Sequence, residues 1–303
     1  MTSRLITILL FCSYSALSQT FEELYRSAQL HTQKGEYNNA LRDLELIQTT
    51  DVQDQLDVLR FRILLLHQLG RTSEAQQACN DYLSLADDPE IRITLGEILM
   101  SINEPYRALE QFQDVVDAYP ELPIGHIMHG LIMAQLGKTE AAKRDLAVAE
   151  KGNVDGYSDI ELVQMSTAFN MAFEYEKALT YAEGSITKKP GAQAYAMKGW
   201  ALNSLKRYTA AIDPLTTSIS LKPSYLAYMQ RGKSNYMLKN DSDAEADFRM
   251  SLRLQADLDE AYLYLGYIYQ SRNMINIACE LWEKAVNINK DSDAAGERET
   301  HCK

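Results

Sequence analysis

The chain has 303 residues, of which 46% are hydrophobic and 24% are charged. It contains 42 acidic and 30 basic residues, which gives a formal net charge of −12 at pH 7. Phosphate binding needs clustered Lys and Arg, and here these residues occur at most in adjacent pairs such as Lys143-Arg144, so the sequence argues against nucleic acid as a partner. Acidic residues on solvated helix faces instead keep a long chain in solution.

Residues 1–18 have the features of a secretory signal peptide. Arg4 precedes an apolar run from Leu5 to Cys12, and Ala16-Leu17-Ser18 supplies small residues at the −3 and −1 positions of a cleavage site. The apolar run is shorter than the roughly 20 residues that a membrane-spanning helix needs, and no later segment is long enough. We therefore predict cleavage after Ser18 and a periplasmic or secreted mature protein. The alternative is an uncleaved amphipathic turn.

The rest of the chain is a tandem repeat. Alanine recurs at intervals of 33 to 36 residues, at Ala40, Ala75, Ala108, Ala142, Ala178, Ala211, Ala244 and Ala278. A second small residue precedes most of these by twelve positions, at Ala28, Gly96, Gly130, Ser166, Gly199, Gly232 and Gly266, whereas Ile63 breaks the pattern. Two helices approach closely only where side chains are small, so the two registers predict a repeated helix–helix crossing.

The pattern around these positions resembles the tetratricopeptide repeat (TPR), a helical hairpin of about 34 residues. The eighth unit, for example, contains Tyr262, Leu265, Gly266, Tyr269, Ala278, Trp282 and Ala285. The resemblance implies an all-α fold, a right-handed α-solenoid of about eight hairpins over residues 19–292. We expect the hairpins to start near residues 21, 56, 89, 123, 159, 192, 225 and 259, and residues 293–303 to form a polar tail.

Turn signals separate the expected helices. Gly35, Gly70 and Gly137 stand where the first helix of a hairpin would end in the left-handed cap conformation. Residues 152–158 form a turn-rich insertion between the fourth and fifth units. This insertion is either a longer loop without consequence or a bend between two halves of four repeats.

Three cysteines remain after the predicted leader. Such a number does not indicate a disulfide framework, which usually contains an even number in a short chain. Cys79 and Cys279 fall at helix positions typical of small core side chains. A bridge between Cys279 and Cys302 is the alternative in an oxidising compartment.

No catalytic motif is recognisable, so we predict a protein that is not an enzyme and has no cofactor. The one arrangement that suggests a metal site is His126 and His129, three residues apart. No Cys or third His stands nearby to complete a zinc shell, and the repeat register places both residues between helices. We therefore predict an interhelical histidine pair.

In TPR proteins, positions 2, 5, 9 and 12 of each first helix line a concave groove, and the resemblance assigns these positions here. The implied groove residues are Leu64, His67, Ile124, Ile127, Leu131, Ile160, Val163, Thr167, Asn170, Trp200, Asn203, Met229, Lys233, Tyr236, Leu263 and Tyr267. Asn170 and Asn203 would bond the backbone of a bound peptide, and the apolar residues would hold its side chains. The alternative is that the chain's own curvature or tail covers these residues.

The resemblance therefore implies a scaffold or adaptor that binds a protein or peptide segment in this groove. Some TPR proteins hold the carboxylate end of chaperone tails with a clamp of Lys, Asn and Arg, but Lys233 and Arg60 are isolated here, so that ligand is not expected. Two alternatives remain open. One is a regulatory or accessory subunit of an envelope enzyme or assembly complex, and the other is a homo-oligomeric structural protein.

Overall fold

The computed structural model describes residues 20–302, which form the α-helices α2–α18 and one 3-10 helix, η1, without a β-strand. The all-α prediction is therefore confirmed: helical hairpins stack on one another, as in the α-solenoid class. Within the same residues, none of the helices has the length and apolar character that would let it cross a membrane. The signal-peptide prediction for residues 1–18 lies outside the described part of the chain.

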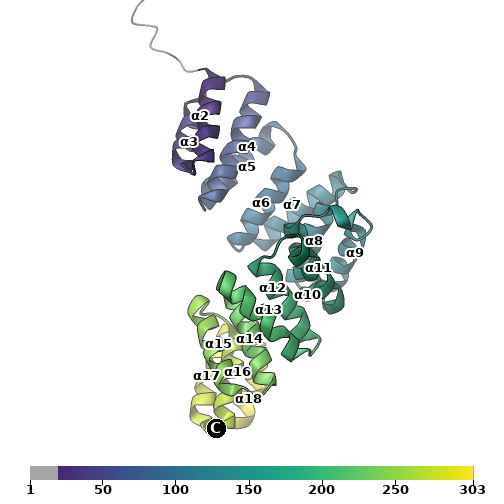
Figure 1. The fold of residues 1–303 in the computed structure, drawn as a ribbon, viewed down its shortest axis with the longest axis vertical. Coiled ribbons are helices and arrows are strands. Elements are labelled where there is room, and N and C mark those ends of the chain that lie inside the picture. The colour runs from purple at the N-terminus through teal and green to yellow at the C-terminus, as the bar shows by residue number, and fades with distance from the viewer. Residues whose placement is uncertain (1–19, 303) are drawn as a thin grey trace, which may run out of the picture. The chain divides into compact units, whose positions relative to one another are not determined.

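The chain divides into two compact units between Pro120 and Glu121. In the described part of unit 1, three hairpins follow one another (Figure 1). Their helices are α2 (Phe21–Gln33), α3 (Tyr37–Leu46), α4 (Val52–Gln68), α5 (Thr72–Leu85), α6 (Pro89–Ser101) and α7 (Pro105–Ala118).

Unit 2 contains the remaining hairpins and a terminal helix. The helices are α8 (Pro123–Gln135), α9 (Thr139–Ala149), α10 (Asp159–Met171), α11 (Tyr175–Lys188), α12 (Ala192–Ser204), α13 (Tyr208–Leu221), α14 (Tyr225–Met237), α15 (Asp241–Leu254), α16 (Asp259–Ser271), α17 (Ile275–Ile288) and α18 (Ala294–His301). In each hairpin of the described chain, we call the even-numbered helix the first helix and the odd-numbered one the second helix.

Most first helices begin at the residue from which the repeat register counts. The exception is α4, which begins at Val52, one turn before Leu56. Asp51 is its N-cap, and the Asp51 side chain accepts a hydrogen bond from the backbone N–H of Asp54. This cap satisfies an otherwise unpaired donor and extends the helix beyond the repeat.

The glycines of the small-residue register make room for large side chains of the second helix. A Cβ added to Gly266 would lie 2.1 Å from Nε1 of Trp282, and one added to Gly199 would lie 2.3 Å from Cγ of Leu215. The space at Gly130 is less restricted, because a Cβ there would lie 3.2 Å from Cγ of Leu146. Trp282 is fully buried as a result, and its indole N–H donates to the carbonyl oxygen of Leu263.

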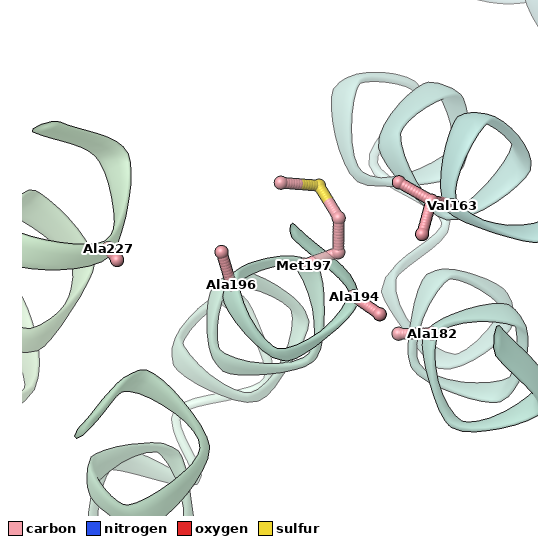
Figure 2. Close-up of a cluster of buried hydrophobic side chains, with 6 residues drawn as sticks. All are labelled: Val163, Ala182, Ala194, Ala196, Met197 and Ala227. Carbon is pink, nitrogen blue, oxygen red and sulfur yellow. The ribbon is translucent and has the colours of Figure 1, made fainter. Parts of the chain in front are cut away.

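Contacts between repeats also depend on small side chains. Figure 2 shows a cluster in unit 2 in which Ala194 of α12 faces Ala182 of α11, and Met197 fills space between neighbouring helices. Val163 of α10 and Ala227 of α14 belong to the same cluster. Three consecutive repeats thus share one core, because no hairpin can bury its apolar surface alone.

The turn inside every hairpin of residues 20–302 contains one residue with positive φ. Glycine fills this position at Gly35, Gly70 and Gly137, as expected. In the remaining hairpins the residues are Asn103, Phe173, Lys206, Lys239 and Asn273, with φ between 59° and 66°. The backbone N–H of the following residue bonds back into the first helix, for example from Glu174 to the carbonyl oxygen of Phe169. The left-handed cap is therefore required even where glycine is missing.

Residues 152–158 lie inside unit 2 and do not divide the chain into two halves of four repeats. Val154–Gly156 form η1, and the buried Tyr157 donates its hydroxyl to the carbonyl oxygen of Ala149 at 2.6 Å. The boundary between units falls at Pro120 instead. The structure thus places no boundary between compact units at the turn-rich insertion.

The C-terminal tail forms a helix. Within α18, Ala294 is buried, and Cys302 directly after it is bonded to Cys279 of α17 with a Cα–Cα separation of 5.6 Å. The Glu297 carboxylate accepts the hydroxyl of Tyr267 at 3.1 Å, and the ring of His301 lies 5.9 Å from that of Trp282. The helix thus covers the end of the last hairpin.

Candidate functional site

A cavity in unit 1 has a volume of about 740 Å³. Its lining comes entirely from the first helices α2, α4 and α6. Counted in the repeat register, most of the lining residues occupy positions 2, 5, 9 and 12: Tyr25, Gln29, Thr32, Asp57, Arg60, Leu64, His67, Glu90 and Glu97. The cavity therefore occupies the face that the resemblance assigns to a groove.

One side of this cavity is aromatic and aliphatic. The ring of Tyr25 lies 5.5 Å from that of Phe61, and Tyr25 also stacks on Phe21. Burial, together with the charge of Asp57, raises the pKa of the Tyr25 hydroxyl. Leu64 is 60% exposed although it is surrounded by lining residues. A ligand could remove this apolar surface from water, which is a favourable change.

The charged side of the cavity is acidic. The lining contains the carboxylates of Asp57, Glu90 and Glu97 and a single guanidinium, that of Arg60. Arg60 is committed to the protein itself, since it ion-pairs with Asp88 and Glu90. The electrostatic field of the cavity therefore favours a cation.

Asp88 connects this ion pair to the helix beneath it. Its carboxylate caps α6 by accepting from the backbone N–H groups of Glu90 and Ile91, at 2.9 and 3.3 Å. Burial acts to raise the pKa of Asp88, but the hydrogen bonds from Ile91 and Arg60 outweigh it and hold that pKa below its usual value. Arg60 is thus fixed in place by the start of the next repeat.

Several expected groove residues of unit 2 are part of the core. Ile127, Leu131, Val163, Met229 and Leu263 are each at most 8% exposed. Position 5 of a first helix here packs against the neighbouring repeat, as Val163 does in Figure 2. For these residues the alternative holds: the chain itself covers them, because neighbouring helices leave little of their side chains exposed.

Asn170 and Asn203 also require a correction. Both are buried, and their amide groups donate to backbone carbonyl oxygens of the next first helix: Asn170 to Met197 at 3.3 Å and Asn203 to Gln230 at 2.6 Å. The Asn203 carbonyl in turn accepts the hydroxyl of Ser234. These amides bond a neighbouring helix of the chain itself, and so they hold the repeats together.

The remaining groove candidates of unit 2 are partly exposed but already have partners. Lys233 forms an ion pair with Glu260 at 2.6 Å and lies over the ring of Tyr264. Tyr236 packs on Tyr264 and Tyr267, with ring centroids 5.2 and 6.3 Å apart. Trp200 is half-buried against the cluster of Figure 2. Together they form an aromatic surface more than an open groove.

Ile160 lines a second, smaller cavity in unit 2. It is 64% exposed and borders a space of about 360 Å³ together with Val163 and Gln193. Ile124 is half-buried at the start of α8, and Thr167 donates its hydroxyl to the carbonyl oxygen of Val163. Of the expected residues in unit 2, only Ile160 thus combines a cavity with a largely exposed apolar side chain.

His126 and His129 are buried against the second helix of their own hairpin. Their Nδ1 atoms lie 3.2 and 2.8 Å from the two carboxylate oxygens of Asp145 on α9. Within residues 20–302, no group of three or more His, Cys, Asp or Glu side chains is arranged to hold a metal ion.

Burial raises the pKa of the Cys79 thiol to about 12, so this cysteine is an unreactive core residue.

A family model described as a tetratricopeptide repeat matches residues 192–225, which span α12 and α13. One chain of the APC/C hetero-tetramer Cut9–Hcn1 is similar in structure, with a TM-score of 0.68 and 14% identity, over 97% of this chain and 58% of that one. The present chain thus spans little more than half of that relative. A TPR protein from Parabacteroides merdae gives a TM-score of 0.61 and 16% identity, over 85% of this chain and 98% of that one.

Residues 192–225 thus match the tetratricopeptide repeat itself, and the described chain shares the helical fold of a solved protein of that family. A monomeric mutant of IFIT1, solved with Gppp-AAAA, has the same fold, with a TM-score of 0.59 and 15% identity over 97% of this chain and 74% of that one. At such identities these structures establish the fold alone. No curated protein matches the chain. TPR repeats generally mediate protein–protein interaction, and the family is typically non-catalytic.

The TPR register could have found the unit 1 cavity. Applied to the first and third repeats, positions 2, 5, 9 and 12 give eight residues, of which Tyr25, Gln29, Thr32, Glu90 and Glu97 line it. Of the expected groove residues, only Leu64 and His67 belong to this cavity. The others lie in unit 2, where burial between repeats accounts for most of the apolar ones.

Proposed function

We propose that this TPR protein is an exported, non-catalytic scaffold, and that its unit 1 cavity binds a partner segment that combines apolar residues with Lys or Arg. The observation that carries the proposal is the cavity on α2, α4 and α6, which is both partly apolar and acidic. Its volume of about 740 Å³ falls in the range of pockets that enclose a ligand, roughly 300–1,000 Å³.

The negative charge of the cavity determines which class of ligand it favours. Glu90 is already paired with Arg60, and Asp57 and Glu97 leave an excess of negative charge that would repel a carboxylate or a phosphate and attract an ammonium or guanidinium group. The IFIT1 structure holds Gppp-AAAA, but a phosphate-bearing ligand does not suit this acidic lining. A basic peptide segment does, because its cations meet the carboxylates while an apolar residue covers Leu64.

Export is supported by two observations. The first is the signal-peptide pattern over residues 1–18, and the second is the disulfide between Cys279 and Cys302. Disulfides persist in the periplasm and outside the cell, and they are rare in reducing compartments. Intact-mass measurement of the protein recovered from the envelope fraction tests this part. We expect a chain that begins at Gln19, and a mass that retains residues 1–18 would contradict export with cleavage.

Peptide selection tests the binding site. We expect phage display against the mature protein to enrich peptides in which Leu or Phe is flanked by Lys or Arg. Leu64→Ser should weaken the selected peptide about tenfold, because it removes an apolar contact at the centre of the site. The matched control is Leu221→Ser, since Leu221 is also exposed, at 55%, but lies in unit 2. Equal affinity of both variants, or enrichment of acidic peptides by this site, would overturn the proposal.

A further inference from the structure

Another cavity of unit 2 is bordered mainly by second helices. It has a volume of about 610 Å³ and is bordered by the second helices α15 and α17, with Tyr262 and Leu265 of α16 between them. Apolar side chains of the second helices, including Met250, Leu252 and Leu281, contribute to it. Because none of its lining belongs to unit 1, this cavity is separate from the site proposed above.

The charged lining of this cavity is entirely basic. Arg249, Arg253 and Lys284 line it, and no carboxylate does. Arg249 is paired with Glu245, which also binds Arg272 and Tyr269. The basic lining contrasts with the chain as a whole, whose formal net charge is −12.

Two of the three cations have no carboxylate partner within residues 20–302. The Arg253 guanidinium contacts only the sulfur of Met250, at 3.8 Å, and the Lys284 ammonium lies 5.8 Å from the ring centroid of Tyr262. Acidic residues are present on α17, but Glu280 and Glu283 form no ion pair with Lys284. The positive charge of Arg253 and Lys284 is therefore available to a ligand.

The position of the cations narrows the class of ligand. Arg253 belongs to α15 and Lys284 to α17, so the cavity has a cation on each of the two helices together with apolar lining side chains. A fatty acid carries one anionic group at one end and would satisfy only one of these charges. A planar bilayer surface cannot enter a cavity between two helices. A protein segment with apolar residues and several carboxylates satisfies both the charges and the apolar lining.

We propose that the cavity between α15 and α17 binds an acidic amphipathic segment of a partner protein. The inference does not depend on the proposed function, because it concerns other helices and a ligand of opposite charge. It gives the chain two sites with different preferences, one acidic on first helices and one basic on second helices.

Fluorescence anisotropy with the mature chain tests the proposal. The probe is a labelled amphipathic peptide of about 16 residues made of Leu and Glu, long enough for a helical ligand in a groove. A second peptide with Gln in place of Glu keeps the shape and removes the charge. We expect the Glu peptide to bind, the Gln peptide to bind at least tenfold more weakly, and binding to weaken between about 50 and 300 mM salt.

Charge reversal at the site provides the decisive variant. Lys284→Glu should reduce the affinity for the Glu peptide about tenfold. Lys239→Glu is the matched control, since Lys239 also lies over a tyrosine ring, at 5.5 Å from Tyr236, but outside the cavity. Circular dichroism melting of both variants checks that each is folded.

Several results would overturn the proposal. One is the absence of binding by the Glu peptide, and another is equal binding to Lys284→Glu and Lys239→Glu. Binding of laurate or of anionic vesicles that Lys284→Glu abolishes, with no binding of the peptide, would assign the site to lipid instead. A dimer that Lys284→Glu dissociates would assign it to a second copy of the chain.

Discussion

A missing Cβ sets the distance between the two helices of several hairpins. At Gly266 the indole of Trp282 occupies the space that a side chain would need. Fully buried aromatic rings have no room to shift, so a methyl group here must displace a helix.

Gly266→Ala is therefore expected to destabilise unit 2 by about 1–3 kcal/mol, the usual cost of overpacking. Gly184→Ala is the control, because a Cβ there would meet only Leu162, at an ordinary 3.5 Å. That variant should stabilise the chain by about 0.5–1 kcal/mol, since Ala is the better helix former. Urea unfolding of both variants measures the difference. Equal effects would mean that the close approach at Trp282 is relaxed in solution.

Asp88 makes unit 1 sensitive to acid. Its pKa in the folded chain lies below the ordinary value of 3.8. Ionised Asp88 therefore stabilises the folded state above roughly pH 4, and this stabilisation is lost as the pH falls through the folded pKa. In Asp88→Asn the side chain can still cap α6, because Asn and Asp are comparable N-caps, but the charge is absent.

We expect wild type to be more stable than Asp88→Asn at neutral pH, and the gap to narrow as the pH falls below about 4. Urea midpoints of the two proteins across this range provide the measurement. A gap that stays constant down to about pH 3 would show that the carboxylate charge of Asp88 contributes nothing to folding.

Single residues of the groove were the hardest to predict from the sequence. Asn170 and Asn203 occupy position 12, and the register alone does not distinguish a side chain that faces a ligand from one that bonds the next helix. The deciding factor is the spacing of neighbouring repeats, which brings the carbonyl oxygens of Met197 and Gln230 within reach. Trp282 was predictable, because a large residue opposite Gly266 must be buried.

Among the helices, α18 is the one that the amino-acid composition did not predict. Its sequence is polar, and Ala294 is its one buried apolar side chain, while Cys302, Glu297 and His301 add a disulfide, a hydrogen bond and a ring contact to the last hairpin. Neither hydrophobic periodicity nor propensity predicts a packed helix from a single buried alanine. The covalent bond to Cys279 supplies what the apolar surface lacks.

Removing this bond should release the helix. The bridge spans 23 residues, and cross-links of that length typically contribute about 2–4 kcal/mol. We expect Cys302→Ser to lower the stability of unit 2 by that order and to expose Trp282 to acrylamide in a Trp200→Phe background. Reductant should reproduce the effect in wild type and add nothing to Cys302→Ser. Unchanged quenching in reduced wild type would show that α18 stays docked without the bond.

For the whole molecule, the repeat architecture was predictable from the sequence, but the position at which the chain divides into two units was not. Each hairpin is specified locally, by a small-residue pair and an apolar stripe, so the helices follow from the register of 33 to 36 residues. The boundary at Pro120 depends instead on how densely successive hairpins contact each other. The turn-rich residues 152–158 suggested a break because they resemble a linker, yet Tyr157 anchors them in the core.

Truncation distinguishes these two boundaries. We expect a fragment of residues 121–303 to be helical and to melt cooperatively. A fragment of residues 159–303 should be less stable, because it loses α8 and uncovers the buried face of α10 that contacts it. Thermal denaturation followed by circular dichroism compares the two. If the shorter fragment proves as stable as the longer one, the contact between α8 and α10 contributes little to unit 2.

The turns with positive φ have a consequence for how this array can evolve. A residue other than glycine in that conformation costs roughly 1–2 kcal/mol, and Asn103, Phe173, Lys206, Lys239 and Asn273 each carry it at a separate, solvent-exposed turn. No turn depends on another, so each position can drift toward glycine or away from it in small, reversible steps. The left-handed backbone at these turns is therefore maintained by the geometry of the hairpin, whichever residue occupies the position.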